Sequence, residues 1–148
     1  MAKTVLVVDD NQNDVLLLQR IMRRHGLVNP VQVLGTGEDA ISYLAGVPPY
    51  SDRKRFPFPA IVFLDLLLPC RSGTEVLEWL QRHPELPPFE KIIYTDVTLF
   101  PELQKCHELG ATAFLLKEEQ ENQFQKLLKK FPEVWEYRYP EEKRPENL

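Results

Sequence analysis

Short runs of mostly apolar residues recur along the chain, and many of their members are β-branched. The five runs span residues 5–8, 31–34, 61–64, 91–94 and 113–116. Runs of four residues are too short for buried helices and are typical of strands covered on both faces. The pattern therefore predicts five buried strands.

The segments between these runs carry apolar residues three and four positions apart, which is typical of helices. Clear examples are the triplets Val15, Leu18 and Met22; Ile41, Leu44 and Ala45; and Val76, Leu77 and Leu80. This spacing continues from Phe124 to Trp135, although Pro132 is expected to kink or end that helix. Strands that alternate with helices predict an α/β protein whose parallel sheet has helices on both faces.

Two segments lie outside the repeat. Residues 47–59 contain four prolines and are expected to form a loop inserted before the third strand. The basic triplet 53–55 within that loop is expected to be solvated. Residues 138–148 are charged, contain two prolines and are expected to fray.

The composition is that of a soluble globular protein. Of the 148 residues, 43% are apolar and 27% are charged, and the formal charge of −4 gives no general attraction to nucleic acid. Cys70 and Cys106 lack the spacing of zinc or disulfide frameworks. No apolar run approaches the ~20 residues of a membrane span or the length of a signal peptide's core. These features predict a single cytoplasmic domain without nucleic-acid or membrane partners.

Polar residues with distinctive chemistry follow four of the five predicted strands. Asp9 and Asp10 come after the first strand and Asp65 after the third, while Thr95 closes the fourth and Lys117 follows the fifth. Ligands of parallel α/β sheets bind beyond the carboxyl ends of the strands. We therefore expect these five side chains to meet at one edge of the sheet.

The expected cluster suits phosphoryl transfer. A carboxylate can act as the nucleophile that forms an acyl phosphate. Three neighbouring carboxylates repel one another unless a hard cation neutralises them, and Mg²⁺ binds through oxygen ligands of this kind. Lys117 could then pair with a phosphoryl oxygen, and the Thr95 hydroxyl could donate a hydrogen bond to the same group.

In order along the chain, these motifs resemble those of response-regulator receivers in two-component phosphorelays. Segment 65–73 matches the family signature Asp-x-x-hydrophobic-Pro-x-x-x-Gly, and the acidic pair, the threonine and the lysine stand in the family's order. The resemblance covers roughly residues 3–131, with 47–59 as an insertion and 132–148 as a C-terminal extension. The insertion and the C-terminal extension look similar to those of stand-alone receivers that partner phytochromes or hybrid kinases. The resemblance implies the flavodoxin-like receiver fold, a single domain with strand order 2-1-3-4-5.

The resemblance also implies a role for each residue of the site. Asp65 would be the phosphoacceptor, and the metal ligands would be Asp10, Asp9 through water or hydrogen bonding, Asp65 itself and the backbone carbonyl of Leu67. Thr95 would be the switch hydroxyl, Phe114 the rotating aromatic and Lys117 the lysine that binds the phosphoryl group.

The implied partners are proteins. A sensor histidine kinase or a phosphotransfer protein would supply the phosphoryl group, and a downstream protein would read the conformational change. The resemblance also allows a homodimer. On this interpretation the chain is a signalling phosphoprotein with Mg²⁺ as its cofactor, and it is not an enzyme.

Three departures from the family pattern flank the site. Asp96 replaces the small residue that usually follows the switch threonine, and Glu118 replaces the proline that usually follows the lysine, so no cis peptide is expected there. The loop after Lys117 is therefore expected to be looser. Leu67 and Val97 make both flanks of the pocket apolar.

Two other functions are considered. Phosphohydrolases of the haloacid-dehalogenase type also use a strand-end aspartate and Mg²⁺, but they carry a second acid where this chain has Leu67. A receiver-like module that binds partners without ever being phosphorylated is the non-enzymatic alternative. Asp96 and Glu118 favour that alternative, whereas the five intact site positions speak against it.

Overall fold

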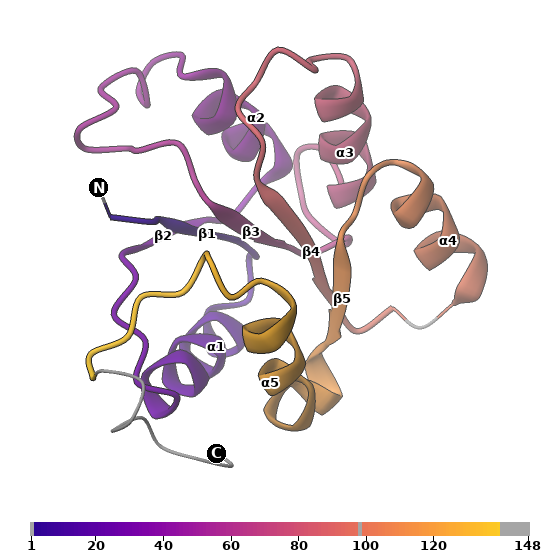
Figure 1. The fold of residues 1–148 in the computed structure, drawn as a ribbon. Coiled ribbons are helices and arrows are strands. Elements are labelled where there is room, and N and C mark those ends of the chain that lie inside the picture. The colour runs from indigo at the N-terminus through magenta and orange to yellow at the C-terminus, as the bar shows by residue number, and fades with distance from the viewer. Residues whose placement is uncertain (1, 98, 140–148) are drawn as a thin grey trace.

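The computed structural model describes residues 2–97 and 99–139, in which strands and helices alternate as predicted (Figure 1). The strands are β1 (Val5–Val8), β2 (Val31–Leu34), β3 (Ile61–Leu64), β4 (Glu90–Thr95) and β5 (Ala113–Leu116). The helices are α1 (Gln12–Arg24), α2 (Gly37–Ala45), α3 (Gly73–Gln81), α4 (Phe100–Glu108), the 3-10 turn η1 (Lys117–Glu119) and α5 (Gln120–Lys130). Four strands coincide with the predicted runs, and β4 is one residue longer at each end.

The five strands form one parallel sheet in the order β2-β1-β3-β4-β5, as the resemblance implied. In the register, Val8 lies beside Leu34 on one side and beside Leu64 on the other. The carboxyl ends of β1 and β3 therefore stand next to each other in the middle of the sheet. Every residue of these two strands is buried, because helices cover both faces.

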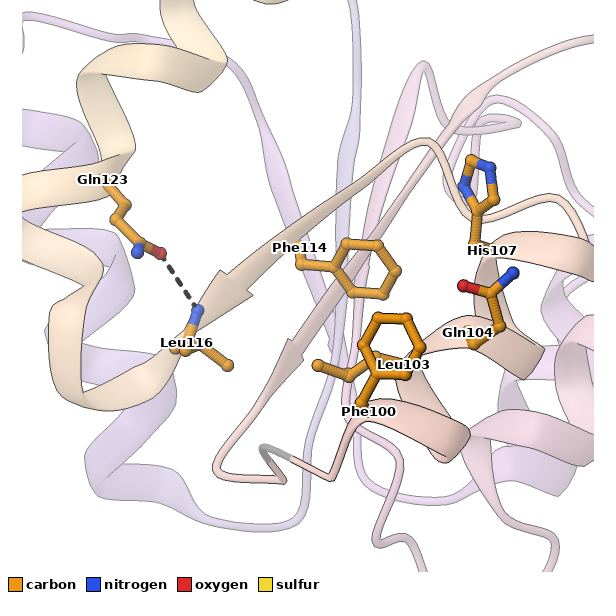
Figure 2. Close-up of a pocket in the computed structure, with 7 residues that line it drawn as sticks. All are labelled: Phe100, Leu103, Gln104, His107, Phe114, Leu116 and Gln123. Carbon is orange, nitrogen blue, oxygen red and sulfur yellow. Dashed lines mark hydrogen bonds between the residues drawn. The ribbon is translucent and has the colours of Figure 1, made fainter.

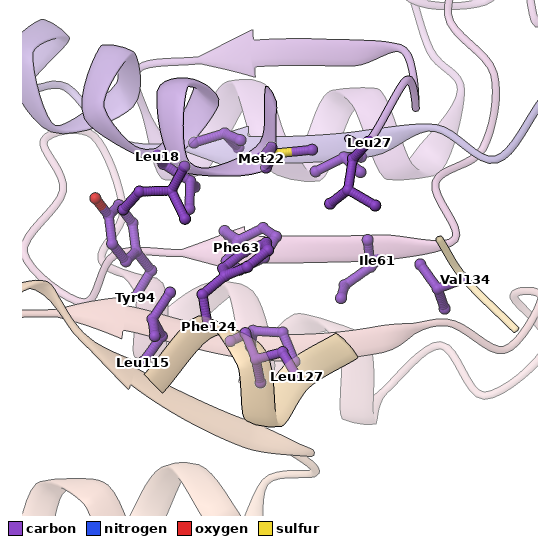
Figure 3. Close-up of a cluster of buried hydrophobic side chains, with 14 of the residues drawn as sticks. Leu18, Met22, Leu27, Ile61, Phe63, Tyr94, Leu115, Phe124, Leu127 and Val134 are labelled. Atoms are coloured by element: carbon purple, nitrogen blue, oxygen red, sulfur yellow. The ribbon is translucent and has the colours of Figure 1, made fainter. Parts of the chain in front are cut away.

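Helices α1 and α5 pack on one face of the sheet, and α2, α3 and α4 pack on the other (Figure 1). The core beneath α1 and α5 centres on Phe63, which stacks with Phe124 (Figure 3). No helix in the described ranges is long and apolar enough to cross a membrane.

Helix α5 ends at Lys130, two residues before Pro132, so the apolar spacing up to Trp135 does not reflect one continuous helix. The chain instead turns back over the core. The Trp135 side chain is buried against Phe124, and its indole N–H donates a hydrogen bond to the Leu127 carbonyl at 3.1 Å. This segment of the expected extension 132–148 therefore caps the core, while residues 140–148 lie outside the described part of the chain.

The proline-rich insertion 47–59 packs against α2, and Arg53 is its main anchor. The Arg53 guanidinium donates hydrogen bonds to the carbonyls of Tyr43 and Leu44 at 2.7 and 2.9 Å, in the last turn of α2. The expectation that this basic triplet is solvated is therefore wrong for Arg53. Its partners are main-chain carbonyls at a helix C-terminus, where a cation is stabilised by the exposed ends of the peptide dipoles.

Candidate functional site

An acidic cluster lies at the carboxyl edge of the sheet, where the sequence predicted it. Asp9 and Asp65 follow the adjacent strands β1 and β3, and their backbone N–H groups continue the sheet hydrogen bonding to Leu34 and Val8. One carboxylate oxygen from each of Asp9, Asp10 and Asp65 lies within 4.8 Å of the others. Asp9 and Asp65 are buried, and Asp10 is exposed at the mouth of the cluster.

Lys117 brings a single positive charge into this cluster from the end of β5. Its ammonium donates hydrogen bonds to Asp14 at 2.9 Å and to Asp65 at 3.0 Å, and its nitrogen lies 2.8 Å from Asp9 Oδ2. Only 7% of the side chain is exposed. Burial alone would lower the pKa of Lys117, but the three carboxylates reverse this effect and raise that pKa above its ordinary value.

Asp9 Oδ2 is a buried oxygen without an aligned donor among the described residues, because its contact with Lys117 is an ion pair that lacks hydrogen-bond geometry. Burial raises the pKa of Asp9, and this exceeds the opposing effect of Lys117. A buried carboxylate oxygen whose near partner is an ion-paired ammonium can bind a further cation.

The loop after β3 wraps around Asp65. The Leu67 N–H donates to Asp65 Oδ1 at 3.2 Å, and the Gly73 N–H donates to the Leu66 carbonyl at 3.1 Å. A Cβ at position 73 would lie 2.2 Å from the Asp65 carbonyl oxygen, so only glycine fits there. Leu67 as a whole residue is 68% exposed. The role of its carbonyl as a metal ligand stays a prediction.

Thr95 and Phe114 lie on the other side of β3 from the acidic pair. Thr95 is buried at the end of β4, and its hydroxyl oxygen accepts a hydrogen bond from the Val97 N–H at 3.3 Å. Phe114 is half-buried on β5 and lines a hollow of about 360 Å³ beside α4. Its ring lies near the side chains of Phe100 and Leu103 (Figure 2). Their switching roles also remain predictions.

Asp14 is a site residue that the sequence reasoning missed. It lies in the first turn of α1, where the Asn11 side chain accepts a hydrogen bond from its N–H. Its carboxylate is 25% exposed and binds Lys117. One signal in the sequence could have found it: Asp14 lies in the first turn of the helix that directly follows the first strand, so it stands close to the carboxyl end of that strand.

The segment after Lys117 is held in place, contrary to the expectation of a looser loop. Residues 117–119 form the 3-10 turn η1, and the Gln120 amide donates to the Lys117 carbonyl at 3.1 Å. The Gln120 side-chain oxygen lies 3.0 Å from the Tyr94 hydroxyl. Within the described ranges the one cis peptide joins Pro48 to Pro49, so the prediction that Glu118 does not follow a cis bond is confirmed.

Response regulators are among the proteins similar to this chain. The response regulator Rcp1 of Synechocystis sp. is 24% identical over 133 residues, which cover 90% of this chain and 88% of that protein. The bacteriophytochrome response regulator AtBRR has a structure with a TM-score of 0.78 at 29% identity, which covers 95% of this chain and 99% of that one. The crystal structure of Mn²⁺-bound Rcp1 has a TM-score of 0.77 at 23% identity, which covers 93% of this chain and 99% of that one.

The family comparison agrees with the fold and the acidic cluster. The profile of the response regulator receiver domain matches residues 5–129, which is most of the chain. The strand order and the three clustered aspartates are those that the resemblance implied. The chain therefore belongs to the response regulator receiver domain family of two-component signalling.

Proposed function

We propose that this protein is a single-domain response regulator that accepts a phosphoryl group on Asp65 with the help of Mg²⁺. The observation that carries the proposal is the cluster itself. Asp65 lies between two further carboxylates and the Lys117 ammonium, so the nucleophile, a metal site and a group that can bind the phosphoryl oxygen converge. A sensor histidine kinase or a phosphotransfer protein of the cytoplasm would be the donor.

The residues present fit a divalent cation. The cluster offers three carboxylates and a buried Asp9 oxygen that lacks an aligned donor, which is the hard-oxygen environment that Mg²⁺ prefers. Asp9, Asp10, Asp65 and the Leu67 carbonyl would hold the ion. Bound there, it would neutralise charge between the carboxylates and the incoming phosphoryl oxygens. The similar protein Rcp1 has a Mn²⁺-bound form, which supports a divalent cation as the ligand.

The chain's own residues would supply the rest of the reaction. A carboxylate oxygen of Asp65 attacks phosphorus and forms the new O–P bond, while the P–N bond of a phosphohistidine breaks and its electron pair returns to the imidazole. Lys117 already bonds to Asp65 and would bind an oxygen of the transferred group. The Thr95 oxygen accepts from Val97, which leaves its hydroxyl hydrogen to donate to another phosphoryl oxygen.

The phosphorylated state would be recognised by a partner that binds to the surface of this domain. Phe114 is half-buried beside the hollow that α4 and α5 flank, so a displacement of Thr95 on β4 could change how its ring packs (Figure 2). A downstream protein or a second copy of the chain would bind there. The boundaries of the signalling unit, residues 3–131 with the extension 132–148, belong to this proposal.

Phosphorylation of the purified protein tests the proposal. Acetyl phosphate with Mg²⁺ should label the wild type, and omission of Mg²⁺ or the substitution Asp65→Asn should abolish the label. Asp52→Asn is the matched control, because Asp52 is an exposed aspartate of the insertion and asparagine keeps its acceptor for the Lys54 N–H. An unlabelled wild type would favour the binding module that never becomes phosphorylated, and a labelled Asp65→Asn would exclude Asp65 as the acceptor.

A further inference from the structure

We propose that Asp14 is a positioning residue for phosphoryl transfer, which anchors the Lys117 ammonium beside Asp65. This role rests on the proposed function. The geometry behind it is direct: Lys117 donates hydrogen bonds to two carboxylates, and Asp14 is one of them at 2.9 Å. The other is the residue that would be phosphorylated.

The three carboxylates around Lys117 have different fates in the reaction. Asp9 would be drawn to the metal, and Asp65 would lose its carboxylate charge when its oxygen bonds to phosphorus. Asp14 does not belong to the cluster of three that could hold a cation, so neither the metal nor the phosphoryl group would take its oxygens. It is therefore the partner that can hold Lys117 while the other two change.

A lysine needs such an anchor more than an arginine would. Its ammonium is a point charge on a flexible four-carbon chain, with three donors that rotate together. If Asp14 is absent, the ammonium can follow Asp9 toward the metal or turn to water. A fixed acceptor on α1 keeps it at the position where phosphoryl oxygens would arrive, and charged groups that are held in place in advance lower the barrier most.

The buried Tyr94 hydroxyl lies between the main chain of Asp14 and the Gln120 side chain, which in turn binds the main chain of Lys117. The Tyr94 oxygen lies 3.0 Å from the Asp14 carbonyl oxygen and 3.0 Å from Gln120 Oε1, and the Gln120 amide donates to the Lys117 carbonyl. Tyr94 is fully buried, and its hydroxyl stands at the rim of the core cluster (Figure 3). The single hydroxyl hydrogen can be donated to either acceptor, so Tyr94 on β4 places two residues that are 103 positions apart in the sequence around one polar group.

The test is the rate of phosphorylation by acetyl phosphate at saturating Mg²⁺, followed by phosphate-affinity electrophoresis. Asp14→Ala should react about tenfold more slowly, because misplacing a reacting group by about 1 Å can cost up to a hundredfold. Asp14→Asn keeps an acceptor oxygen and should retain most of the rate. Ala and Asn both suit this partly exposed position in the first turn of α1, so both variants should fold.

A double-mutant cycle with Lys117→Ala separates positioning from a structural role. If Asp14 acts through Lys117, Asp14→Ala should slow the wild type but not the Lys117→Ala variant. An unchanged or faster rate for Asp14→Ala, an Asn variant as slow as Ala, or an equal slowing in both backgrounds would overturn the role. In each of these cases the wild type is labelled, whereas an unlabelled wild type would remove the proposed function itself.

Discussion

Lys117 faces Asp9, Asp14 and Asp65 from the end of β5, and Asp10 stands at the mouth of the same cluster. One ammonium cannot balance four carboxylates that lie this close together. Burial makes this negative charge more costly, and it raises the pKa of Asp9 despite the neighbouring lysine. The residues at this edge therefore carry an excess of negative charge, most of which a divalent cation would offset.

Leu67 should lengthen the lifetime of the phosphorylated form. An acyl phosphate is lost when water attacks phosphorus in line, and a side chain without polar atoms cannot orient that water. Leu67 follows Asp65 by two residues, its N–H donates to the Asp65 carboxylate, and the residue is exposed to solvent. Leu67→Asn should speed the loss of the phosphoryl group several-fold in a decay assay at fixed Mg²⁺.

The matched control for this variant is Leu67→Met, which keeps an apolar side chain of similar volume and should decay at the wild-type rate. Equal lifetimes for Leu67→Asn and the wild type would refute the argument. Asp96 offers a second check, because it is exposed beside Thr95 and could itself orient water. A clearly longer lifetime for Asp96→Ala would also contradict the account.

The elements show where sequence patterns suffice. The strands could be predicted almost to the residue, because each is a short and mostly apolar run. The expectation that all five are buried is wrong for the edge strand β2, where Val33 is 45% exposed, whereas β1 and β3 are buried along their whole length. The same reasoning extended the apolar spacing of the last helix to Trp135, whereas α5 ends at Lys130. Phe131 and Trp135 continue the apolar spacing, and both are buried, but they lie beyond the end of α5. The helix ends before Pro132, because proline has no N–H for the helical hydrogen bond. Apolar spacing reports burial, and burial does not require a helix.

The segment after α5 should contribute strongly to stability. Trp135 is buried against Phe63 and Phe124, and its N–H is satisfied by the Leu127 carbonyl. Trp135→Ala should lower the free energy of unfolding by about 3–5 kcal/mol, the usual cost of removing a large aromatic side chain from a core. Urea denaturation measures this loss.

Trp79→Ala is the control for Trp135→Ala, because Trp79 is only half-buried on α3, where it stacks on His83. Its loss should cost clearly less. Because Trp135 packs within its own chain, its role is to cap the core, and it is not exposed for a dimer contact. If both variants unfold at the same urea concentration, the segment after α5 is not part of the core.

At the scale of the whole molecule, the parallel order of the sheet explains both what the sequence reveals and what it hides. The chemistry-bearing residues at strand ends could be found because all carboxyl ends meet at one edge. Asp14 and Gln120 were missed because they reach that edge from helices, through contacts that span the fold. The hydrogen bonds of Arg53 could not be predicted either, because their acceptors are main-chain carbonyls, which every residue has.

The central claim is that a phosphoryl group is carried on Asp65 and on no other residue. Borohydride reduces an acyl phosphate to an alcohol, so the phosphorylated aspartate becomes homoserine and can be located by peptide mass spectrometry. After incubation with acetyl phosphate and Mg²⁺, the account predicts this conversion at position 65 alone, and none when Mg²⁺ is withheld. Conversion at Asp9, Asp10 or Asp14, or at no aspartate of a labelled protein, would contradict it.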